Sequence, residues 1–140
     1  MRLIGAIGIW ILSAAVAAAA EPAARFTTVD VIVDAGADSL AAYQIEVVAE
    51  GDALILSVEG GDPPAFDAPP TYDPAALRGG RIIIAALSTD ANLPSGRHRV
   101  ATLHLRESGT VSYRARLMAA ARADGSRFTP QVITATGGQR

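Results

Sequence analysis

The sequence predicts an all-β protein, an antiparallel β-sandwich of about seven to nine strands. Three observations support this class. Short runs alternate apolar and polar residues with a period of two, turn residues separate these runs at short intervals, and no segment carries a convincing helical pattern. The chain has 140 residues and no cysteine, so one modest core without disulfides must stabilise the fold.

The first 20 residues are predicted to be a secretory signal peptide and not part of the domain. Arg2 gives a positive start, an apolar run follows, and Ala18 and Ala20 form an A-x-A-like cleavage site. A retained membrane anchor is the alternative, but the apolar run is short for a membrane span. We therefore expect a secreted or periplasmic protein whose single domain comprises residues 21–140.

The first strands of the domain follow from alternation. Residues 26–34 and 40–50 alternate and are rich in β-branched or apolar side chains, and residues 53–60 form a short apolar run. Gly51 is a turn residue between the second and third runs, so they are predicted to form a hairpin. The apolar faces of the first two strands are formed by Val29, Val31, Val33, Tyr43, Ile45 and Val47.

Four more strands are predicted in the second half of the chain. Residues 81–88 are apolar, residues 97–108 and 111–120 alternate, and residues 127–137 close the domain after a hairpin signal. A single helical turn is expected at residues 73–77. The alternation of the third of these strands places an apolar set inward, namely Val111, Tyr113, Ala115 and Leu117.

The long stretch of residues 58–84 contains the candidate binding residues. Asp62, Phe66, Tyr72 and Asp73 lie close together among prolines and glycines. Aromatic rings stack on sugars and carboxylates accept hydrogen bonds from hydroxyl groups, so these four residues are the predicted ligand-binding set. The same residue types also suit a protein interface. A structural cover is the alternative, in which the two rings fold back onto the end of the core.

Nearly the whole expected domain, from Phe26 to Thr136, resembles the cohesin-like modules of the bacterial carbohydrate-binding β-sandwich superfamily. The resemblance rests on the segments VDVIVDAG, LAAYQIEV, VEGGDPPAF, PPTYDPAALRGGRIIIAALS and LPSGRHRVATLHLR. It implies a jelly-roll sandwich that binds and does not catalyse. Cohesins bind dockerin modules of exported glycan-degrading enzymes, and related modules bind polysaccharide. The chain departs from this pattern in having one module and a short segment around Gly51.

Catalysis is not expected. His98 and His104 are six residues apart on one predicted strand, about 20 Å, too far to share one metal ion. The sequence has no cysteine, no nucleophile elbow and no glycine-rich phosphate loop, so we expect no enzyme activity, no cofactor and no metal. All basic residues are arginines and none form a block, which argues against nucleic acid. Arg114 and Arg116 share an outward face that suits an acidic partner or a solvated surface.

Two function classes follow. The first is an exported binding module for a carbohydrate or an exported protein, as in polysaccharide breakdown. The second is a structural or assembly protein of the cell envelope, within a secretion or pilus apparatus. The only tryptophan, Trp10, lies in the expected signal peptide. Flat crystalline polysaccharide requires a row of exposed rings, so a protein or a soluble glycan is the better match.

Overall fold

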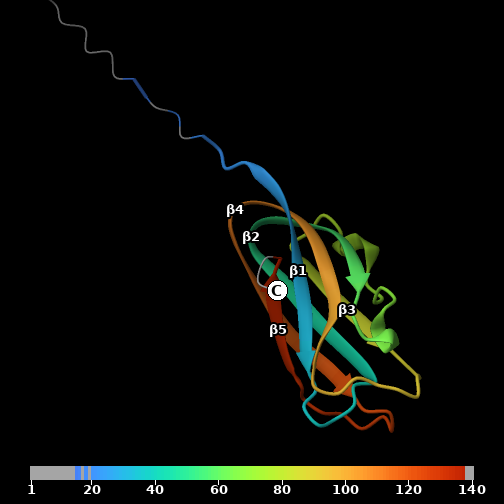
Figure 1. Ribbon diagram of the computed structural model, residues 1–140. Coiled ribbons are helices and arrows are strands. Elements are labelled where there is room, and N and C mark those ends of the chain that lie inside the picture. The colour runs from blue at the N-terminus through green and yellow to red at the C-terminus, as the bar shows by residue number, and fades with distance from the viewer. Residues whose placement is uncertain (1–14, 17, 19, 138–140) are drawn as a thin grey trace, which may run out of the picture.

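A computed structural model describes residues 15, 16, 18 and 20–137, so most of the expected signal peptide lies outside the described residues. The described part of the chain forms an all-β fold with one antiparallel sheet in the order β3-β2-β4-β1-β5 (Figure 1). No described helix is long and apolar enough to cross a membrane. The strands are β1 (Ala24–Asp34), β2 (Ala42–Gly60), β3 (Arg81–Leu87), β4 (Arg97–Ala121) and β5 (Gln131–Thr136), with 3₁₀ turns η1 (Pro64–Phe66) and η2 (Pro74–Ala76).

The described residues form five strands and not seven to nine, because two pairs of expected strands are continuous. The strands expected at 40–50 and 53–60 do not form a hairpin, because residues 42–60 form the single strand β2, and residues 97–108 and 111–120 both belong to β4. Gly51 interrupts the register without ending the strand, since pairing with β4 resumes at Asp52. Its φ of 127° is open to glycine alone. The sequence-based strand count was wrong because a bulge and a turn attract the same residue types.

The two halves of β2 have different neighbours. The first half, from Ala42 to Glu50, pairs with β3 on one side and with the end of β4 on the other. The second half, from Asp52, pairs with the start of β4, which also pairs with β1, and β1 carries β5 at its other edge. The sheet therefore changes direction at Gly51 and folds over the core.

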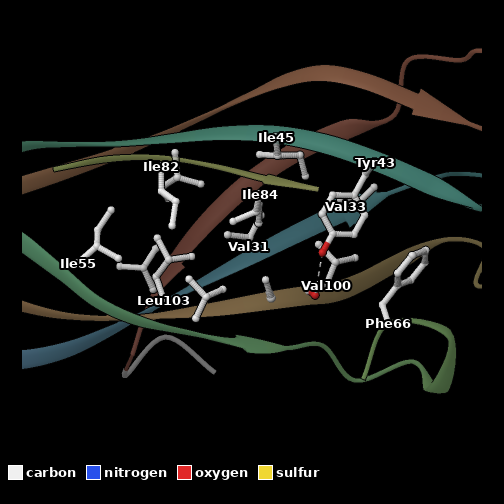
Figure 2. Packing of buried hydrophobic residues seen from close by; sticks show 14 of the residues in the cluster. Val31, Val33, Tyr43, Ile45, Ile55, Phe66, Ile82, Ile84, Val100 and Leu103 are labelled. Carbon is white, nitrogen blue, oxygen red and sulfur yellow. Dashed lines mark hydrogen bonds between the residues drawn. The ribbon is translucent and has the colours of Figure 1, made fainter. Parts of the chain in front are cut away.

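The core lies between these two parts of the sheet. Figure 2 shows Ile45, Ile82 and Ile84 on the side of the core opposite Leu103 and Ile55. All five side chains are at most 1 % exposed. Burial of such a side chain contributes about 1.5–3 kcal/mol, so this cluster is the main source of stability. It also includes every residue predicted above to form the apolar faces of the first two strands, namely Val29, Val31, Val33, Tyr43, Ile45 and Val47.

A buried polar group marks the bend in β4. Glu107 is 7 % exposed, accepts a hydrogen bond from the hydroxyl of Tyr113, and has Oε1 2.7 Å from Arg25 Nη2. Burial, followed by the hydrogen bond to Glu107, raises the pKa of Tyr113. These contacts tie β1 to both halves of β4, and they satisfy a carboxylate that would be costly to bury alone.

Candidate functional site

The loop of residues 61–80 places the four predicted binding residues in three different environments. Phe66 is 2 % exposed, and its ring centroid lies 5.4 Å from that of Tyr43 in a tilted arrangement. Figure 2 shows the ring beside Tyr43 and Val100 at one end of the cluster. Phe66 therefore occupies the position of a structural cover, and its ring is not presented to solvent.

Asp62 anchors the loop to β4. Its Oδ1 accepts hydrogen bonds from Arg99 Nη2 at 2.5 Å and Nε at 3.2 Å. Arg99 Nη1 also donates to the carbonyl of Gly60 and to Thr102 Oγ1 at 2.6 Å, and the Thr102 hydroxyl donates to Asp30 at 2.7 Å. Asp62, Asp30 and Arg99 line an open pocket of about 340 Å³. The side chains that would orient a ligand there already bind one another.

Tyr72 and Asp73 are the two predicted residues that share a pocket. The pocket has a volume of about 580 Å³ and lies between residues 71–76 and β3, with Arg81 and Ile83 in its lining. Asp73 caps η2 by accepting a hydrogen bond from the backbone N–H of Ala75 at 2.9 Å. Tyr72 is half-buried and packs against the core. The lining of this pocket includes an aromatic ring, a carboxylate and a guanidinium group.

A second candidate site lies on the outer side of the sheet where β3, β2 and the end of β4 pair. Because side chains alternate along a strand, the register aligns outward residues of the three strands in rows. We call this surface the β3–β2–β4 face. Its four rows are Leu87, Ala42 and Ala121; Ala85, Gln44 and Ala119; Ile83, Glu46 and Arg116; and Arg81, Val48 and Arg114.

One half of the β3–β2–β4 face is hollow and largely apolar. A depression of about 260 Å³ lies here because alanines occupy most of its floor. Leu87, at the end of β3, is 74 % exposed, and Met118, in β4, is 39 % exposed. The residues that line the depression are Ala42, Tyr43, Gln44, Ala85, Ala119, Ala120, Ala121, Gly125 and Arg127.

The other half of the face is an arginine cluster built around Glu46. The Glu46 side chain is only 13 % exposed, and Arg81 and Arg116 are 60 % and 63 % exposed. Arg81 Nε and Nη2 lie 2.6 and 2.5 Å from Oε2, and Arg116 Nε lies 3.2 Å from Oε1. The bond from Arg81, and then that from Arg116, lowers the pKa of Glu46 against the effect of desolvation. A second pair joins Arg114 to Glu50 at 2.9 Å.

The outward orientation of Arg114 and Arg116 was predictable from alternation, and the structure confirms it. Their relation to Glu46 was not, because it depends on the register between β2 and β4. The alanine-lined depression also gave no clear sequence signal. Alanines at every second position of a strand do not by themselves indicate a binding surface. Only strand pairing brings the alanines of three strands together.

The two histidines have different neighbours. His98 Nε2 lies 2.8 Å from the carbonyl oxygen of Ser95. His104 Nε2 lies 3.2 Å from Glu59 Oε1, without the alignment of a hydrogen bond. Among the described residues, no group of three or more His, Cys, Asp or Glu side chains is placed to hold a metal ion.

Comparison of the chain with models of protein families, with curated proteins and with solved structures gave no match.

Proposed function

We propose that this chain is an exported, non-catalytic binding module of the cohesin-like sandwich type, and that it binds an exported protein through the β3–β2–β4 face. The observation that carries the proposal is the apolar depression bordered by exposed arginines. Protein interfaces have an apolar centre and a polar rim, and Arg and Met are enriched in them. The cohesin-like resemblance supports the same class of function.

The size of the face indicates how a partner would cover it. Four rows on three strands span roughly 27 by 14 Å, about 400 Å². A stable interface needs about 800 Å² on each partner. The face would therefore form the centre of the interface. The loop that carries Gly125 and Arg127, and residues 71–76 beside β3, would complete it.

A soluble glycan is the second candidate ligand, at the pocket of Tyr72 and Asp73. A half-exposed ring beside a carboxylate and the Arg81 guanidinium group offers both stacking and hydrogen bonds to hydroxyls. Because Arg81 belongs to both this pocket and the β3–β2–β4 face, the two candidate sites are continuous.

Substitution of Ala119 by arginine tests the proposed interface. A long charged side chain would fill the depression, so we expect the immobilised domain to lose its exported protein partner. Ala91→Arg is the matched control, because Ala91 is exposed in the loop between β3 and β4, and it should bind as the wild type does. Equal capture by both variants would contradict the proposal. Binding on a glycan array that Tyr72→Ala abolishes would favour the glycan instead.

Export has a separate test. If residues 1–20 are a signal peptide, mass spectrometry of the protein recovered outside the cytoplasm should find Glu21 as the first residue. A mature chain that retains Trp10 would exclude cleavage at this site.

A further inference from the structure

We infer that the partner is acidic at the point of contact and that Glu46 is a positioning residue for its recognition. The carboxylates of the partner would meet Arg81 and Arg116, whose guanidinium groups Glu46 holds in place. An aliphatic side chain of the partner would enter the neighbouring depression. This inference rests on the proposed function, and it adds the chemistry of the partner to it.

Charge on the face is the first argument. Arg81, Arg114 and Arg116 lie on it, and a fourth arginine, Arg127, lines the depression. They are opposed by Glu46 and by Glu50, which pairs with Arg114. The face therefore carries a surplus of positive charge on a chain whose formal net charge is −2. Complementary charge steers a partner to such a surface and suppresses wrong partners.

The geometry around Glu46 is the second argument. Its two carboxylate oxygens bind different strands, Oε2 to Arg81 of β3 and Oε1 to Arg116 of β4. The hydrogen bonds to Glu46 use Nε of Arg81 and Nε of Arg116, and the two arginine side chains are 60 % and 63 % exposed. Their solvent-facing guanidinium groups can therefore donate further hydrogen bonds to a ligand. Arginine donors are suited to planar recognition of carboxylates. Because the side chains are ordered before binding, less conformational entropy is lost on contact.

The depression is the third argument. Its volume of about 260 Å³ is enough for one branched aliphatic side chain but small for an extended ligand. It lies directly beside the arginine cluster, since the Gln44 row is next to the Glu46 row. A partner that uses both features must carry an aliphatic side chain with carboxylates within a few residues of it. In the resulting interface an apolar centre is surrounded by a charged rim.

A short peptide tests this chemistry without knowledge of the natural partner. The probe is a capped pentapeptide with leucine in the centre and two aspartates on each side, titrated into the isotope-labelled mature protein. We expect a dissociation constant in the millimolar range and shifts of the methyl resonances of Ala42, Ala85 and Ala119. Peptides with lysine in place of aspartate, or glycine in place of leucine, should bind more weakly. Added salt should weaken the binding of the aspartate peptide.

Two matched variants separate positioning from net charge. Glu46→Gln and Glu50→Gln remove the same charge, but only Glu46 holds Arg81 and Arg116. If net charge alone attracted the probe, both variants would bind it more tightly. If Glu46 positions the arginines, Glu46→Gln should bind the probe about two- to fivefold more weakly, which is the range of a surface ion pair. Glu50→Gln should not bind the probe more weakly than the wild type does. The Nε–H resonances of Arg81 and Arg116 should also move in Glu46→Gln alone.

The inference is overturned if the lysine peptide binds as well as the aspartate peptide, if no probe shifts the three alanine methyls, or if Glu46→Gln strengthens binding as Glu50→Gln does. The proposed function would survive any of these results as long as Ala119→Arg still abolishes capture of a protein partner. If Ala119→Arg did not abolish capture of a protein partner, the proposed function would be contradicted as well.

Discussion

At the scale of single residues, Phe66 shows how one side chain defines a long loop. Its ring packs on Tyr43, and its backbone carbonyl accepts a hydrogen bond from the N–H of Gly61 at 2.7 Å. The chain approaches so closely here that a Cβ at Gly60 would lie 2.1 Å from the carbonyl oxygen of Asp67. The loop is therefore held against the end of β2 by packing and backbone contacts together.

Phe66→Ala should destabilise the protein by about 3–5 kcal/mol, because it removes a buried ring and leaves a cavity. We expect the melting temperature to fall by about 10 °C or more. Asp67→Ala is the control, since Asp67 is exposed and should change stability by about 0.5 kcal/mol or less. Thermal unfolding followed by circular dichroism measures both. Equal melting temperatures for the two variants would mean that the ring does not close the core.

Because Asp38 forms an ion pair with Arg122, we expect the stability of the protein to depend on pH. Arg122 donates to both carboxylate oxygens, at 2.8 and 3.1 Å, and this hydrogen bonding lowers the pKa of Asp38 from its ordinary value of 3.8. A pKa that is lower in the folded state gives stability that is present above the unfolded value and lost as the pH falls through the folded one.

Asp38→Asn should therefore be less stable than the wild type at neutral pH, and the difference should shrink as the pH falls below 3.8. Denaturant unfolding at a series of pH values measures this difference. Asp90→Asn, a change at an exposed loop residue, is the control. A difference between Asp38→Asn and the wild type that stays constant down to strongly acidic pH would contradict the assignment.

At the scale of elements, the sequence predicted where strands occur better than where they end. Alternation and short apolar runs are local signals, so they located the segments that form β1 to β5, and alternation separated the inward Tyr113 from the outward Arg114. Continuity through Gly51 was missed because only the register with β4 shows it. Only part of the β3–β2–β4 face was predictable, for the same reason. Arg116 was expected outside, but its contact with Glu46 joins residues 70 positions apart.

Gly51→Ala should destabilise the protein strongly by straining the bend in β2. Gly51 has φ of 127°, and a Cβ there would lie 2.7 Å from the carbonyl oxygen of Thr110. Gly36→Ala is the matched control, since Gly36 also has a positive φ, at 60°, but a Cβ added there would have nothing within 4 Å. The control should lose about 1–2 kcal/mol, and Gly51→Ala clearly more. Equal losses in denaturant unfolding would show that β4 does not constrain the bend.

At the scale of the whole molecule, β2 and β4 run through both parts of the folded sheet, so neither part has a complete set of strands of its own. We predict that the domain unfolds in a single transition. Tyrosine fluorescence, which reports on Tyr43, Tyr72 and Tyr113, should change together with the circular dichroism of the strands. Separate midpoints for the two probes would indicate two independent units.

The contact between Thr71 and β3 has a consequence for how the protein behaves at high concentration. β3 lies at one end of the strand order, and an open edge strand is a template on which a foreign strand can add, the first step towards aggregation. Thr71 occupies the middle of that edge through two backbone hydrogen bonds with Ala85, of 2.8 and 2.9 Å. Pro69 and Pro70 precede it and have no N–H to donate. The loop that suggests a binding site in the sequence thus obstructs intermolecular strand addition at the β3 edge of the sheet.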